Sequence, residues 1–170
     1  MTKSLQIFDY HIWANSSVFK HINGLPHEIY HQKVDSVFSS LSETVMHMYQ
    51  VDYIWLMVIK QNRYEDIIQA INPLNELKSA SLEIVEEKFR QIAKEYNQFI
   101  SQLDDIHSEI TIQHPSFGAL TASYEELFHH VVNHGTYHRG NITAILRQLG
   151  YKGIPTDYIF YLYDHKGKQR

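Results

Sequence analysis

Two histidines, His134 and His138, lie four residues apart in a stretch that has the pattern of one long helix. Apolar residues recur from Thr121 to Gly150 at steps of three, four or their sums, the period of a core-facing helix stripe. On an ideal helix both histidines fall within about 50° of this stripe's mean direction. A buried polar group without partners costs about 1–3 kcal/mol. A metal ion bound by both rings would supply the shared partner, at about 2.0–2.1 Å from each nitrogen.

His47 supplies a candidate third ligand from a second predicted helix, over residues 37–60. It lies within an apolar stripe of that helix, one turn before Val51. Three protein ligands with further positions left open are typical of a catalytic metal rather than a structural one. Imidazoles without cysteine favour Zn, Ni, Fe or Cu. The alternative is that each ring is a core histidine hydrogen-bonded to a carbonyl or a polar neighbour.

The spacing of the histidines is by itself a weak signal. With 12 histidines in 170 residues, composition alone gives about 0.8 HxxxH pairs. The sequence has three such pairs: His27/His31, His130/His134 and His134/His138. The first pair follows Pro26 without an apolar stripe, so we expect it on the surface. His130 lies at the stripe's edge, about 90° from its mean direction. Three interpretations therefore stay open for it: a metal ligand, a residue that supports a ligand, or a surface histidine.

These side chains must be positioned by the helices that the apolar periodicity predicts. We expect long helices at about 4–23, 37–60, 81–103 and 121–150, which together make a single all-α domain with a four-helix bundle. A short helical turn is expected near 67–71. A small hairpin or irregular crossover is expected at 104–120, before the last long helix. The aromatic segment 158–163 is expected to pack across the bundle end, and Gly135 and Gly140 to allow close helix packing.

Composition excludes several classes of function. The net charge is −4 and no basic block appears, so the chain lacks the electrostatic footprint of a nucleic-acid binder. Without cysteine, disulfides and a cysteine nucleophile are excluded, and thiol chemistry would need a thiol cosubstrate. No secretory leader and no apolar run of about 18 residues is present, so we expect no membrane partner and a cytoplasmic location.

Several motifs resemble the DinB-like (DinB/YfiT) family of metal-binding four-helix bundles. The matching residues are Phe8-Asp9-Tyr10, Trp13-Ala14-Asn15, His47 with Asp52 and Trp55, the run His130-Val131-Val132-Asn133-His134-Gly135-Thr136-Tyr137-His138-Arg139-Gly140, and Pro155-Thr156-Asp157-Tyr158. The resemblance implies an up-down-down-up bundle with a divalent metal on His47, His134 and His138, Zn or Ni before Fe or Mn. It also implies a homodimer. Asn141 departs from the glutamine that many relatives carry there.

The resemblance leaves the reaction open, because relatives include metal-dependent hydrolases and transferases or isomerases that use a low-molecular-weight thiol. We expect a metal-dependent enzyme acting on a small-molecule substrate, with thiol S-transfer slightly favoured over hydrolysis by this analogy. Candidate substrate contacts are Asn15, Tyr137, Arg139 and His130. The alternatives are a non-catalytic metal-binding stress-response protein that acts as a dimer, and a purely structural bundle.

Overall fold

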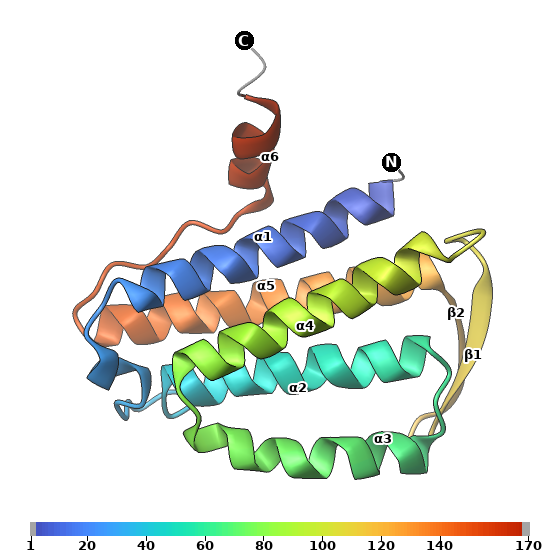
Figure 1. Cartoon of the computed structure of the whole chain (residues 1–170), viewed down its shortest axis with the longest axis horizontal. Coiled ribbons are helices and arrows are strands. Elements are labelled where there is room, and N and C mark those ends of the chain that lie inside the picture. The colour runs from blue at the N-terminus through green and yellow to red at the C-terminus, as the bar shows by residue number, and fades with distance from the viewer. Residues whose placement is uncertain (1–2, 168–170) are drawn as a thin grey trace.

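Four long helices form the body of the protein. The structure, a computed structural model, describes residues 3–167, without the side chains of residues 3–5 and residue 78. The long helices are α1 (Lys3–Asn23), α2 (Leu41–Ile59), α4 (Leu82–Ser101) and α5 (Tyr124–Gln148). Both α1 and α2 pack against α4 and α5, so the four helices surround one core (Figure 1). The expectation of a mostly helical fold is confirmed.

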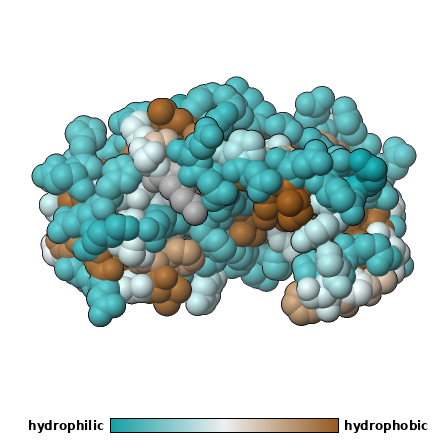
Figure 2. Space-filling model, turned by 90° about the horizontal axis from the view of Figure 1, so that it is seen from below, coloured by the Kyte–Doolittle hydropathy of each residue, from teal (hydrophilic) through white to brown (hydrophobic). Residues whose placement is uncertain are grey.

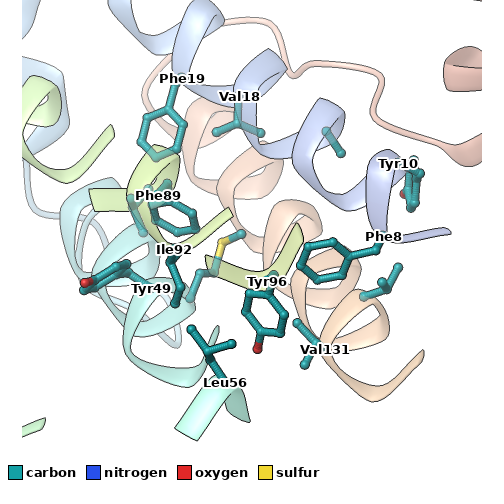
Figure 3. Packing of buried hydrophobic residues seen from close by; sticks show 14 of the residues in the cluster. Phe8, Tyr10, Val18, Phe19, Tyr49, Leu56, Phe89, Ile92, Tyr96 and Val131 are labelled. Atoms are coloured by element: carbon teal, nitrogen blue, oxygen red, sulfur yellow. The ribbon is translucent and has the colours of Figure 1, made fainter. Parts of the chain in front are cut away.

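The predicted apolar stripes meet in this core. Val85, Phe89, Ile92 and Tyr96 of α4 are buried, as are the stripe residues of α5 from Leu127 to Ile145. Aromatic rings from α1 and α4 face each other where these helices pack, and Phe8 and Tyr96 lie with ring centroids 4.6 Å apart (Figure 3). Burial of these apolar side chains is the main term that holds the helices together.

The long helix that carries two of the candidate ligands begins at a capping box. The Glu126 backbone N–H donates to Ser123 Oγ at 3.3 Å, and the Ser123 backbone N–H donates to Glu126 Oε2 at 2.8 Å. Both bonds satisfy N–H groups that a helix start leaves without partners. Ser123 is therefore the N-cap residue of α5. Gly150 follows the helix with φ of +85°, a conformation that glycine adopts without strain.

The crossover before α5 is a hairpin, one of the two predicted forms. Strands β1 (Glu109–His114) and β2 (Gly118–Ser123) pair antiparallel, with His114 opposite Gly118 at the turn. The hairpin lies at one end of the bundle and leads directly into α5 (Figure 1). It therefore fixes where α5 begins, although Thr121 lies in the strand rather than in the helix.

One boundary and two connections differ from the sequence prediction. Helix α2 begins at Leu41 rather than at residue 37, because Ser40 caps it and Val37 is 80% exposed. A short 3-10 helix, η1 (His27–Tyr30), precedes this segment. The connection predicted to hold one helical turn contains α3 (Tyr64–Ile71) followed by the 3-10 helix η2 (Asn72–Ser79). Both pack against α2, so this connection contains more packed helical structure than the single predicted turn.

The sequence prediction that the C-terminal aromatic segment packs across the bundle end is wrong. It forms α6 (Tyr158–Lys166), which projects from the bundle beside α1 (Figure 1). Tyr161 packs against Tyr10 at 6.0 Å and Trp13 at 5.8 Å between ring centroids. The aromatic rings of α1 thus determine its position, through contacts between residues about 150 positions apart in sequence.

The part of the chain that the structure describes contains no helix that could span a membrane. None of its helices is both long and apolar enough to cross a bilayer. The face shown in Figure 2 is mostly hydrophilic, with hydrophobic residues in separate patches.

Candidate metal centre

The three predicted ligands come together where α2 and α5 pack. His47 projects from α2, and His134 and His138 project from successive turns of α5. Their ring centroids are 4.3 Å apart for His134 and His138, 4.5 Å for His47 and His138, and 5.1 Å for His47 and His134. The helical HxxxH spacing thus places two rings together, and the packing of α2 on α5 adds the third.

The distances between the ligand nitrogens are compatible with a single small cation. The Nε2 atoms of His47 and His134 are 3.2 Å apart, and one nitrogen from each of the three rings lies within 4.8 Å of the others. A tetrahedral ion at about 2.1 Å from each ligand needs about 3.4 Å between nitrogens. One pair already meets this requirement, and small side-chain rotations would close the others. The donor set therefore fits a metal ion of the imidazole-preferring type.

The electrostatics of the cluster hold the rings neutral, the form that binds metal. Burial lowers the pKa of His134 to about 3, and repulsion from a charged His138 or His47 adds to this shift. Burial, with repulsion from His47, lowers the pKa of His138 to about 4. Burial also lowers the pKa of His47. At neutral pH all three rings consequently offer lone pairs to a cation without first losing a proton.

The surroundings include two residues whose part the sequence did not reveal. Phe38 packs on His47 and His138 at 5.1 Å and 5.3 Å between ring centroids. The Asn141 amide nitrogen lies 3.2 Å from His138 Nδ1. The (i, i+3) spacing of Asn141 from His138 could have indicated their contact, because residues three apart on a helix are neighbours. Phe38 lies in the loop before α2, where helix periodicity does not predict contacts.

His47, one member of the cluster, lines a cavity of about 500 Å³. Phe38, Met46 and Gln50 also line it, together with Glu43 and Lys33, which form an ion pair at 2.7 Å. Tyr137 is 65% exposed, and its ring meets that of His138 edge-on at 4.9 Å. A small molecule in this cavity would therefore meet polar groups, an apolar wall and His47, the one member of the cluster that lines it.

His130 lies outside the cluster. It is exposed, its ring contacts that of Trp55 at 4.4 Å between centroids with a tilt of 54°, and its centroid is 6.3 Å from that of His134. The geometry thus groups His47, His134 and His138 and leaves His130 beside them.

Asn15 and Arg139 belong to a buried polar network between α1 and α5, rather than to the wall of the 500 Å³ cavity. Arg139 is 1% exposed and donates to Asn15 Oδ1 and to Thr136 Oγ1, each at 2.8 Å. Its other Nη1 hydrogen points to His11 Nδ1 at 3.4 Å. Substrate contact by Asn15 and Arg139 stays a prediction, while their described contacts join helices.

His11 and Asp52 complete this network, and sequence reasoning gave neither a role. The His11 Nε2–H donates to Asp52 Oδ2 at 2.9 Å, with both side chains buried. His11 therefore links the carboxylate of Asp52 to the guanidinium of Arg139, which offsets the cost of burying both charges. The spacing of His11 and Asn15, four residues apart on α1, was a signal that could have joined them.

Of the two glycines expected to allow close packing, only Gly135 has this role. A Cβ on Gly135 would lie 2.4 Å from His11 Cε1 and 2.8 Å from Arg139 Nη1. A Cβ on Gly140 would meet nothing within 4 Å, so the prediction for Gly140 was wrong. The side of α5 that bears Gly135 faces α1, whereas Gly140 is exposed.

Fold and site together define a helical-bundle protein with three histidines arranged so that they could hold a metal ion. The chain belongs to the DinB family, whose family model matches residues 1–169. It is 40% identical over 161 residues to Protein DinB from Bacillus subtilis (strain 168), with 94% of each chain covered. It also resembles in fold the crystal structure of a DinB-like protein from Bacillus cereus ATCC 10987, with a TM-score of 0.64 at 16% identity, covering 89% of this chain and 94% of that one.

Proposed function

We propose that the protein is a metal-dependent enzyme in which His47, His134 and His138 bind one divalent ion, Zn or Ni before Fe or Mn. The observation that carries this proposal is the convergence of three ligand nitrogens within 4.8 Å from two helices. The lowered pKa values of His134 and His138 support it, because neutral imidazoles are the ligating form. Membership of the DinB family is consistent with such a site.

The surrounding residues support a catalytic rather than a sealed centre. His47 lines a cavity of about 500 Å³, within the usual size of small-molecule sites. There Met46 and Phe38 would bind an apolar part of a substrate, and Gln50 would orient a polar part. The exposed Tyr137, whose ring contacts that of His138, is a further candidate contact. The bound ion would lower the pKa of a water or thiol and so generate a nucleophile near neutral pH.

Within this class we favour transfer to a low-molecular-weight thiol over hydrolysis. Support comes from analogy within the family alone; because the chain has no cysteine, a cosubstrate would have to supply the thiol. The test incubates zinc-loaded or nickel-loaded protein with glutathione, cysteine or other small thiols and an electrophile. Thioether formation that depends on the metal supports the proposal. Ester or amide hydrolysis without thiol transfer would replace it with a hydrolase.

A non-catalytic metal-binding protein is the other outcome of these assays. It would show no turnover and, after cobalt or manganese substitution, no exchangeable water in water-proton relaxation. The open cavity beside His47 favours the enzyme, because a sealed site would exclude solvent from the ion.

The proposal includes the up-down-down-up helix order and a homodimer. Figure 1 supports the order, since α1 and α5 run one way and α2 and α4 the other. Exposed apolar residues on the projecting α6 support a dimer, with Ile159 51%, Phe160 41% and Tyr163 67% exposed. Light scattering after size-exclusion chromatography tests this, and a monomer at micromolar concentration would exclude the dimer.

A further inference from the structure

A second cavity, of about 300 Å³, lies between α1 and α4. None of the three clustered histidines lines it. Its walls are mostly apolar and include aromatic rings from both helices (Figure 3); they comprise Phe8, Ile12, Phe19, Phe89, Ile92 and Tyr96. Small-molecule sites begin at about this volume, so the cavity has room for a molecule of about one ring. Its rim consists of the half-buried Glu86 and the exposed Ser16, Arg90, Lys94 and Asn97.

Three buried polar side chains interrupt this apolar lining. His11, Asn15 and Asp52 line the cavity and are 2%, 5% and 3% exposed. The hydrogen bond from His11 occupies Asp52 Oδ2, and the one from Arg139 occupies Asn15 Oδ1. Asp52 Oδ1 is buried and has no hydrogen-bond partner among the described residues. Because buried carboxylate oxygens almost always accept a hydrogen bond, we expect Asp52 Oδ1 to accept one from a bound molecule.

The charges next to the cavity indicate which donor fits. Asp52 carries the negative charge of the buried network, and Arg139 balances it through His11. The other charged side chains of the lining, Glu86, Arg90 and Lys94, lie at the partly exposed rim. A cationic or anionic group placed beside Asp52 would leave a net charge in the buried apolar part of the cavity, at a large desolvation cost. A neutral hydroxyl or N–H adds a hydrogen bond and no charge.

We propose that the cavity between α1 and α4 binds a small neutral molecule with an apolar ring and one hydroxyl or N–H group. The ring lies among the aromatic side chains of α1 and α4, and a small rotation of the Asp52 carboxylate lets Oδ1, which is fully buried in the ligand-free protein, accept a hydrogen bond from the hydroxyl or N–H. This site is separate from the three-histidine centre and does not need a metal ion.

The test compares 4-fluorophenol with 4-fluorotoluene, which have similar shapes, by ¹⁹F NMR titration of the full-length protein in EDTA. A purely apolar cavity would prefer the more hydrophobic fluorotoluene. A hydrogen bond to a buried carboxylate reverses this order, so fluorophenol should bind saturably and at least about tenfold more tightly. Equal affinities, tighter binding of fluorotoluene, or no saturable binding of fluorophenol would overturn the proposal.

Cavity-filling variants locate the binding. Ala93 of α4 lines the cavity and is half-buried, so Ala93→Leu should weaken fluorophenol binding at least about tenfold by occupying its space. Ala144→Leu is the matched control, because Ala144 is an exposed helical residue that does not line the cavity; its affinity should stay within about twofold of wild type. If Ala93→Leu fails to fold by circular dichroism, Ser16→Leu at the exposed rim replaces it. Unchanged affinity in a folded cavity-filling variant would contradict the assignment.

Discussion

Acidification should destabilise the metal-free protein through the two imidazoles of α5. The folded-state pKa is lowered from 6.5 to about 3 for His134 and to about 4 for His138. In the unfolded chain both rings take up a proton as the pH falls through 6.5, whereas in the folded protein they stay neutral. The unfolded state then binds more protons, so stability is fully present above about pH 6.5 and is lost as the pH falls towards 4.

The magnitude follows from the same values. At pH 5 each ring is almost fully protonated when unfolded and almost neutral when folded, which costs about 2 kcal/mol per histidine relative to pH 7. For both rings the upper limit is about 4 kcal/mol, less any relaxation that lets water reach His134. His138 is the better-defined contributor, because only 6% of its surface is exposed.

The assay is urea unfolding in EDTA, followed by circular dichroism at half-unit steps from pH 7.5 to 4.5. His138→Gln should flatten the dependence on pH by nearly one proton between pH 6 and pH 5. His129→Gln is the matched control, because His129 is exposed on the same helix, and it should leave the slope unchanged. Equal slopes for wild type and His138→Gln would refute the reasoning, since the pKa of His138 would then be the same in the folded and the unfolded protein.

Two further substitutions test the packing around the site. Gly135→Ala should destabilise the protein by about 2–3 kcal/mol in urea unfolding, because its Cβ would clash with His11 and Arg139. Gly140→Ala, which meets nothing within 4 Å, should be neutral or stabilise by up to about 1 kcal/mol, and equal effects of the two would contradict the close approach of α1 to α5. Asn141→Ala should weaken zinc affinity about tenfold in a competition titration, because the Asn141 amide lies beside His138 Nδ1 and, with its oxygen turned to that atom, would accept the Nδ1–H of a zinc-bound ring and orient it; unchanged affinity would exclude this role.

The sequence predicted the parts of the fold that local pattern determines. Apolar periodicity placed the four long helices, and the HxxxH spacing placed His134 beside His138, because both depend on the geometry of a single helix. His47 joined them only on the prediction that its helix would pack against theirs, and the distances confirm that the three rings are close.

The features that sequence reasoning missed depend on contacts between distant segments. The bond from His11 to Asp52 joins residues 41 positions apart, and α6 lies beside α1 through Tyr161 and Trp13. Helix periodicity carries no information on such pairs. Gly135 and Gly140 differ only in which side of α5 faces a neighbour, and the start of α2 shifted because apolar Val37 lies exposed in a loop.

The central claim is that three imidazoles hold one ion, and elemental analysis after purification without an affinity tag tests it most directly. The wild type and His129→Ala, the exposed control, should each carry about one divalent ion per chain, and His47→Ala should retain little, because two ligands from one helix bind weakly. An ion at full stoichiometry in His47→Ala, or none in the wild type even after incubation with zinc and nickel, would contradict the claim.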